Sequence, residues 1–309
     1  MKFRRVDCVG EGITGFGVSP FQTGWTLVDV SAPTEQYPTK VPGNVQLTLM
    51  EAGKVPDPFQ GQNNEALKWI PTRVWEYHNH IDLKPWIRPI LQRWPKGGLL
   101  HLIFDAIDYD ASFFIANQRV TRQTGMFSPI DLVCAVTPTT EQTLAQETQP
   151  IPLSVKFHRQ PWWRTHAVKS QMAFGWDFAP EIRTVGIWRE VRFQYTGPAF
   201  FTEVWAFFDS TRPKREHEKI HVQGKISFLD VGTLVDDDQA HSLILEVQTN
   251  TGTTTHPISV KSNQRFEVII DHSDLPQWSP WRWVNRICAR FRCESFSMGR
   301  SRMNIGGRL

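Results

Sequence analysis

Asp177 lies between two aromatic residues, Trp176 and Phe178, in the segment Phe174–Pro180. Aromatic rings stack on the apolar face of a pyranose, and a carboxylate accepts hydrogen bonds from adjacent hydroxyl groups, so the segment suits a carbohydrate ligand. The same residues also fit a core tryptophan beside a turn-forming aspartate, and composition alone favours that interpretation.

Other groupings of reactive side chains give weaker indications of a site. His78 and His80 share one face of a strand and could supply two metal ligands, but no third ligand accompanies them, and exposed surface histidines are the simpler interpretation. Cys288 and Cys293 lack partner ligands, and Asp236–Asp238 lacks the calcium-loop pattern and fits a hairpin loop. We therefore predict no metal ion and no cofactor.

One nucleotide-binding motif and one hydrolase motif are also missing from the sequence. The glycine-rich segment Glu11–Gly17 is not followed by a Walker lysine, which argues against phosphate binding. The sequence contains no Gly-x-Ser-x-Gly elbow, the motif that marks serine hydrolases of the α/β type.

Composition indicates a globular protein of 309 residues with 40% apolar and 21% charged residues, and with 13 tryptophans. No run of 18 apolar residues is present, so we expect no membrane partner, and four cysteines are too few for a disulfide scaffold. The N-terminus lacks the apolar segment of a secretory signal, which predicts a cytoplasmic location.

The net charge of +3 comes from residues 281–309, which carry seven arginines and one glutamate, so the rest of the chain is mildly acidic. Nucleic acid is therefore not an expected partner.

Short apolar or alternating segments separated by Gly, Pro and Asn predict an all-β protein. One helix is expected at Val45–Ala52, with Gly53 as its C-terminal cap. A domain boundary is expected near Tyr195–Pro198, and the strands beyond it fit an immunoglobulin-like sandwich. The predicted strands include Leu99–Phe104, Ala111–Ala116, Ile151–Phe157, Trp188–Phe193, Phe200–Phe208, Ile220–Leu229, Ser242–Thr249 and Arg265–Ile270.

Several motifs spread over residues 20–195 resemble, in the same order, the N-terminal region of glycoside hydrolase family 2, in its β-mannosidase branch. The combination is specific, although each motif alone is weak. The matching segments are Val41–Val45, Ala52–Gly53, Pro56–Phe59, Leu67–Trp69, Trp75–Tyr77, Phe104–Ala111, Met126–Pro129, Lys169–Gln171, Trp176–Asp177 and Thr184–Trp188.

This resemblance implies a galactose-binding-like jelly-roll sandwich, then an immunoglobulin-like β-sandwich, then a (β/α)₈ barrel. It also implies that Trp176, Asp177 and Phe178 reach into the sugar pocket of the barrel. Phe178 stands where the family usually has Trp, and it lacks the indole N–H donor; Ala179 stands where Gly is usual. The exact sugar preference therefore does not follow from the motif.

The catalytic half expected of the family does not follow in this sequence. A retaining glycosidase needs two carboxylates about 5–5.5 Å apart, and a barrel takes about 250 residues. The segment Gln62–Glu65 resembles the Asn-Glu acid/base signature, but it follows Asp57–Phe59 in the first domain and not a barrel strand. We therefore predict no catalytic residue in this chain.

The C-terminal tail departs from the family after Pro280. A Gly-Glu-Pro-x-Leu-Tyr type of segment is expected, and the codons of Trp283–Cys288 shifted by two nucleotides permit Gly-Glu-Pro-x-Leu, although not the final Tyr. We therefore hypothesise that residues 281–309 are translated out of frame and are disordered. A genuine arginine-rich extension that binds anions or RNA is the alternative.

Taken together, the sequence predicts the non-catalytic N-terminal part of a β-mannosidase-like hydrolase that acts on a β-mannoside or a related oligosaccharide. The predicted units are residues 1–197, the jelly roll, and residues 198–280, the immunoglobulin-like sandwich, followed by the tail. The missing barrel is the expected protein partner. A free-standing carbohydrate-binding module and a truncated, non-functional fragment are the alternatives.

Overall fold

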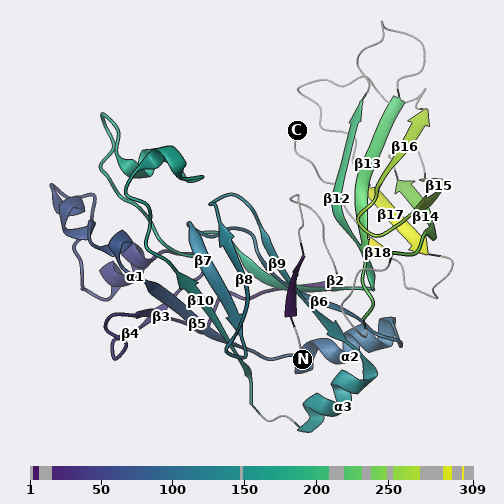
Figure 1. The fold of residues 1–309 in the computed structure, drawn as a ribbon, viewed down its shortest axis with the longest axis horizontal. Helices are drawn as coiled ribbons and strands as arrows, with labels where there is room; N and C mark the ends of the chain where they lie inside the picture. The colour runs from purple at the N-terminus through teal and green to yellow at the C-terminus, as the bar shows by residue number, and fades with distance from the viewer. Residues whose placement is uncertain are drawn as a thin grey trace, which may run out of the picture.

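The computed structural model describes residues 3–6, 16–146, 149–208, 219–231, 238–248, 253–271, 288–293 and 301–302. These residues form antiparallel strands with a few short helices, which confirms the all-β prediction (Figure 1). In the described ranges, no helix is both long enough and apolar enough to cross a membrane.

The first part of the chain folds into two facing antiparallel sheets. The five-stranded sheet has the order β1 (Phe3–Val6), β9 (Ile130–Val136), β6 (Gly98–Phe104), β11 (Val191–Thr196), β2 (Phe16–Pro20). The six-stranded sheet has the order β4 (Gln36–Thr39), β3 (Trp25–Asp29), β5 (Trp75–Ile81), β10 (Ile151–Phe157), β7 (Asp110–Ile115), β8 (Gln118–Thr124). Most neighbours in each sheet are not consecutive in sequence, as in a jelly roll, and the pairs β3–β4 and β7–β8 are the exceptions.

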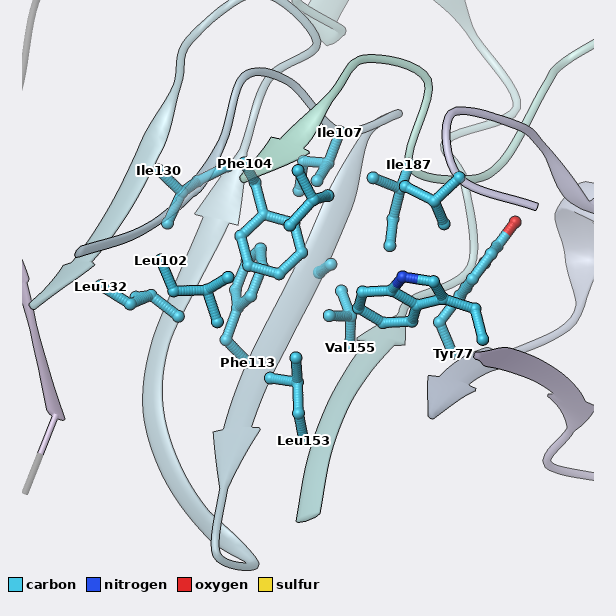
Figure 2. Close-up of a cluster of buried hydrophobic side chains, with 14 of the residues drawn as sticks. Tyr77, Leu102, Phe104, Ile107, Phe113, Ile130, Leu132, Leu153, Val155 and Ile187 are labelled. Atoms are coloured by element: carbon cyan, nitrogen blue, oxygen red, sulfur yellow. The ribbon is translucent and has the colours of Figure 1, made fainter. Parts of the chain in front are cut away.

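One core fills the space between these two sheets (Figure 2). Strand β10 shows how alternation builds it: Leu153, Val155 and Phe157 are buried, while Ser154 and Lys156 between them are partly exposed. Across the core from this sheet, Phe104 of β6 packs edge-to-face on Phe113 of β7, with ring centroids 5.0 Å apart.

The predicted helix is present as α1 (Val45–Glu51), with caps at both ends. The Asn44 side chain accepts a hydrogen bond from the Leu47 N–H at 2.8 Å. At the other end Gly53 has φ +68° and its N–H donates to the Met50 carbonyl, as in a Schellman motif. The expectation of a glycine cap is therefore confirmed.

The expectation of a single clear helix is wrong, because α2 (Lys84–Arg93) and α3 (Pro138–Gln146) are also present. Helix α2 contains Pro89 inside it, a residue that normally ends a helix, and its buried Ile87 and Ile90 outweigh that signal. The strand expected at Trp188–Phe193 begins instead at Val191.

The second part of the chain forms two more antiparallel sheets, of three and four strands. Seven strands in two sheets are typical of an immunoglobulin-like sandwich. Buried Phe201, Val222, Leu245 and Phe266 contribute to the core of this part. The orders are β12 (Ala199–Phe208), β13 (Lys219–Phe228), β16 (Arg265–Asp271) in one sheet and β15 (Thr253–Val260), β14 (His241–Gln248), β17 (Cys288–Cys293), β18 (Ser301–Arg302) in the other.

Strand β15 was not expected, because its threonine-rich start continues a polar stretch of sequence. Strands β17 and β18 lie within the arginine-rich tail, and β17 pairs with β14 along its length. These eight tail residues are thus extended strands, whereas the rest of residues 281–309 lies outside the described residues. The out-of-frame hypothesis stays a prediction.

The two parts of the chain meet at the outer face of β6 and β9. Leu99 and Val133 from these strands are buried against Phe200 and Leu229 from the second part. This contact explains why every residue of β6 is buried, on both faces of the strand. The connection of residues 158–190 lies at the other end of the first two sheets, away from β12 and β13 (Figure 1).

Candidate functional site

The segment Trp176–Ala179 is a tight turn at the tip of the connection between β10 and β11. The Trp176 N–H donates to the Ala179 carbonyl at 3.0 Å, and the Ala179 N–H donates back to the Trp176 carbonyl at 3.1 Å. Asp177 and Phe178 occupy the two central positions of the turn. Trp176 is 53% exposed and Phe178 is 79% exposed, so Trp176 is not a core residue.

The Asp177 carboxylate is also exposed, and among the described residues no hydrogen bond or ion pair engages it. The guanidinium of Arg164, which begins the short helix η3 (Arg164–His166), lies 5.7 Å from the centroid of the Trp176 ring. The turn therefore presents two apolar rings and one carboxylate acceptor to solvent, which is the chemistry that the sequence predicted for a sugar.

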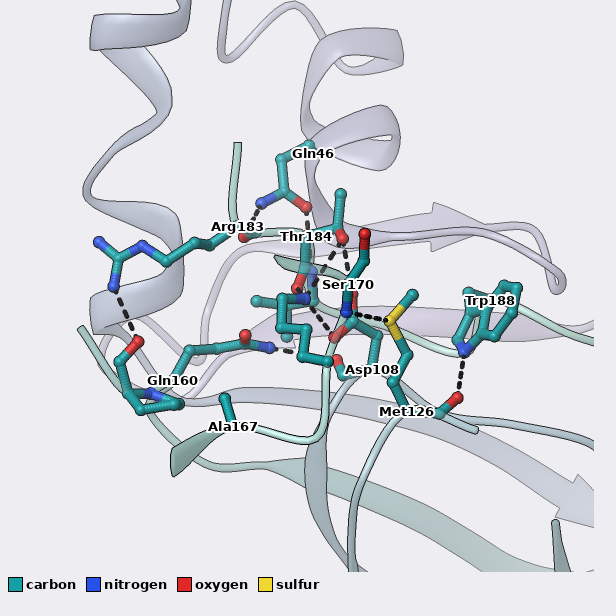
Figure 3. Close-up of polar contacts among 12 residues, drawn as sticks. Gln46, Asp108, Met126, Gln160, Ala167, Ser170, Arg183, Thr184 and Trp188 are labelled. Atoms are coloured by element: carbon teal, nitrogen blue, oxygen red, sulfur yellow. Dashed lines mark hydrogen bonds and ion pairs between the residues drawn. The ribbon is translucent and has the colours of Figure 1, made fainter. Parts of the chain in front are cut away.

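A buried ion pair fixes the connection that carries this turn (Figure 3). The Lys169 ammonium pairs with the Asp108 carboxylate, and both side chains are almost completely buried. Lys169 also donates to the Thr184 carbonyl at 2.8 Å, and the Thr184 hydroxyl donates to Asp108 at 2.6 Å. Burial raises the pKa of the Asp108 carboxyl and lowers the pKa of the Lys169 ammonium, while the ion pair opposes both shifts.

A second set of hydrogen bonds anchors the two ends of the same connection. Gln160 donates from its backbone N–H to the Pro71 carbonyl at 2.9 Å and from its side chain to the Asp108 carbonyl at 3.2 Å. Arg183 donates to the Pro161 carbonyl at 3.1 Å, and its own carbonyl accepts from Gln46 of α1 at 2.8 Å. These hydrogen bonds hold both ends of the connection that carries the exposed turn.

Sequence reasoning identified the three residues of the turn and missed the residues that support it. Asp108, Lys169 and Thr184 stand in three of the motif segments, and the structure brings these segments together. The sequence feature that could have indicated this cluster is the presence of an acidic, a basic and a hydroxyl residue in three separate motifs. Gln160 and Arg183 carry no comparable signal in sequence.

The weaker candidates do not form sites in the described part of the chain. His78 and His80 lie on the outward face of β5, as the simpler interpretation expected, and no group of three or more potential metal ligands occurs among the described residues. Glu65 of the acid/base-like segment lies in η1 (Asn63–Leu67) and forms an exposed ion pair with Lys68 at 2.7 Å. The side chains of Cys288 and Cys293, Asp236–Asp237 and most of Glu11–Gly17 lie outside the described residues.

Comparison with known proteins gives the family. A family model described as "Glycosyl hydrolase 2 galactose-binding domain-like" matches residues 25–189, which is more than half of the chain. The chain belongs to this family. The matched residues include the turn, the buried ion pair and α1, so the geometry described above lies inside the family region.

Curated relatives and solved structures agree with this assignment. Beta-mannosidase B of Emericella nidulans is 28% identical over 205 residues, which is 59% of this chain and 22% of the relative. Beta-mannosidase B of Thermothelomyces thermophilus is 24% identical over 200 residues, 57% of this chain and 22% of the relative. The chain spans about a fifth of the length of the curated relatives that it matches. It is homologous to the N-terminal part of family 2 β-mannosidases.

The fold likeness extends beyond the family region. A β-D-mannosidase from Dictyoglomus thermophilum superposes with a TM-score of 0.68 at 18% identity, covering 94% of this chain and 36% of that chain. A family 2 β-galacturonidase from Eisenbergiella tayi superposes with a TM-score of 0.58 at 14% identity, covering 97% of this chain and 45% of that chain. These matches confirm the predicted order of a galactose-binding-like sandwich followed by a second β-sandwich.

Proposed function

We propose that this chain is the non-catalytic N-terminal part of a β-mannosidase-like glycoside hydrolase, and that its exposed turn completes the sugar pocket of a catalytic barrel. The observation that carries the proposal is the turn itself, in which Asp177 is unengaged between the exposed rings of Trp176 and Phe178. A mobile turn would lose affinity to the entropy of ordering, and the buried Lys169–Asp108 pair avoids that loss.

Each residue of the turn has a distinct role in this proposal. The rings of Trp176 and Phe178 stack on the apolar face of a β-mannoside or a related oligosaccharide. Asp177 accepts hydrogen bonds from adjacent sugar hydroxyls, and a bond to a charged acceptor contributes about 1.5–3 kcal/mol. The described residues form no barrel, so the paired carboxylates of hydrolysis would come from another part of the protein.

We also propose that residues 1–197 and 198–280 are separate domains. Strand β11 ends at Thr196 and β12 begins at Ala199, and the sheets on either side have separate cores. A short linker between two such cores is typical of a domain boundary.

Sequencing the gene and its transcript from the Pro280 codon through about 2 kb downstream tests the proposal. We expect one frame to continue into a barrel with an Asn-Glu pair and a second glutamate. The protein expressed from that frame should hydrolyse p-nitrophenyl β-D-mannoside, and Asp177→Ala should lower its kcat/KM by about 10–100-fold, the loss of one charged hydrogen bond. A stop after Leu309 with no barrel downstream would contradict the proposal and leave the carbohydrate-binding module or the fragment.

A further inference from the structure

Trp162 and Trp163 form a stacked aromatic pair on the surface, outside the turn described above. Their ring centroids lie 4.5 Å apart with an interplanar angle of 29°. Trp162 is 73% exposed and Trp163 is 50% exposed. Two large exposed aromatic rings side by side are unusual on a protein surface unless they bind a ligand or a partner.

The backbone on which this pair stands is held from both sides. Pro161, directly before the pair, accepts the hydrogen bond from Arg183, and the Gln160 side chain donates to the Asp108 carbonyl (Figure 3). The Gln160 backbone N–H donates to the Pro71 carbonyl. The backbone under the two tryptophans is therefore already ordered, so a ligand that stacks on their rings binds without the entropy cost of ordering that backbone.

The pair is flanked by two arginines, Arg159 and Arg164, both exposed. Neither makes an ion pair within the described part of the chain. Guanidinium N–H groups that are free to donate suit the oxygen atoms of a hydroxyl-rich ligand, whereas burial against an apolar protein surface would leave them without water or a partner. The combination of ring faces and donors favours a saccharide as the occupant.

The pair is continuous with the turn that carries Trp176. Arg164 follows Trp163 directly in the chain, and its guanidinium lies 5.7 Å from the centroid of the Trp176 ring. One surface therefore runs from Trp162 through Arg164 to Trp176. We propose that Trp162 and Trp163 are a second saccharide subsite, so that the ligand is an oligosaccharide with several sugar units and not a single terminal sugar.

This inference rests on the proposed function, because it extends the sugar site at Trp176 and Asp177. Two linked subsites raise the affinity for a ligand long enough to reach both, since the second contact forms at a high effective concentration. A single sugar gains nothing from the second subsite.

The test compares methyl β-D-mannopyranoside with β-1,4-linked mannopentaose, titrated into the full 309-residue chain and followed by NMR. We expect the pentasaccharide to bind at least about tenfold more tightly than the monosaccharide, a modest gain for a linked second contact. The double variant Trp162→Ala/Trp163→Ala should abolish that gain and leave monosaccharide binding unchanged. Ile269→Ala, an exposed apolar residue on β16, is the matched control and should change neither affinity.

The outcomes separate the inference from the proposed function. If the pentasaccharide gains nothing over the monosaccharide, or if the gain survives in the double tryptophan variant, the second subsite is wrong. If the tryptophan variant removes the gain but Asp177→Ala leaves monosaccharide binding intact, the second subsite stands and the role proposed for Asp177 fails. If neither sugar binds at millimolar concentration, the inference is overturned, while the hydrolysis test above still decides the proposed function.

Discussion

Lys169→Met removes the ammonium group that pairs with the Asp108 carboxylate and leaves that carboxylate buried. Methionine keeps much of the apolar length of the lysine stem, so the change is mainly electrostatic. Removing one partner of a buried ion pair costs about 3–5 kcal/mol, because the remaining charge stays in a low-dielectric site without its counter-charge. We expect the free energy of unfolding to fall by that amount.

This loss is large enough to measure by calorimetry at pH 7. For a domain of about 150–250 residues, each kcal/mol shifts Tm by about 2–4 °C, so Tm should fall by about 6–20 °C. The double variant Asp108→Asn/Lys169→Met holds no charge at this buried site and should recover at least half of the loss. Lys54→Met breaks an exposed ion pair with Glu35 at 3.0 Å, and this matched control should leave Tm unchanged.

Two results would refute this reasoning. The first is a Tm for Lys169→Met within about 2 °C of the wild-type value, less than the shift for 1 kcal/mol. The second is a double variant that is no more stable than the single variant, because the loss would then come from packing and not from an unpaired charge.

Three further predictions concern other residues in the first part of the chain. A Cβ on Gly186 would lie 2.7 Å from backbone at the start of α1, so Gly186→Ala should destabilise the fold by about 1–3 kcal/mol in urea unfolding. Burial opposes ionisation of Asp29, but hydrogen bonds from Ser31 and Arg73 outweigh it and lower its pKa. The stabilisation that Asp29 gives is therefore present above about pH 4 and is lost as the pH falls through its folded-state pKa. In urea unfolding, Asp29→Asn should therefore be less stable than the wild-type chain at pH 7, and this difference in stability should shrink at pH 3. Phe178→Trp restores an indole N–H donor, and NMR titration with a mannoside should show about two- to tenfold tighter binding, the value of one neutral hydrogen bond.

Much of the fold could be predicted from the sequence because its strands alternate cleanly. The strand Ile151–Phe157 was predicted with its exact limits, since its apolar residues recur with a period of two. Helix α2 was missed because Pro89 stands inside it, and tertiary packing of Ile87 and Ile90 overrides that local signal. Strand β15 was missed because its polar residues continue a turn-like stretch.

The site could be predicted only in part. The pattern of Asp177 between two aromatic residues is local, so sequence could identify it. Lys169 and Asp108 are far apart in the chain, so the sequence places an acid and a base in separate motifs but does not indicate that the two side chains pair. Tryptophan is a residue type that is mostly buried, so the sequence does not indicate that Trp162 and Trp163 are exposed. Their exposure depends on the path of the connection and not on residue type.

The assignment of a sugar site to the exposed turn is tested most directly by saturation-transfer NMR with methyl β-D-mannopyranoside on the chain as it exists. We predict transfer from the wild-type chain to the sugar, loss of transfer in Asp177→Ala, and retention in Asp238→Ala, an exposed aspartate in the second part of the chain. Transfer that is equal in Asp177→Ala and the wild-type chain would contradict the assignment of the sugar site to this turn.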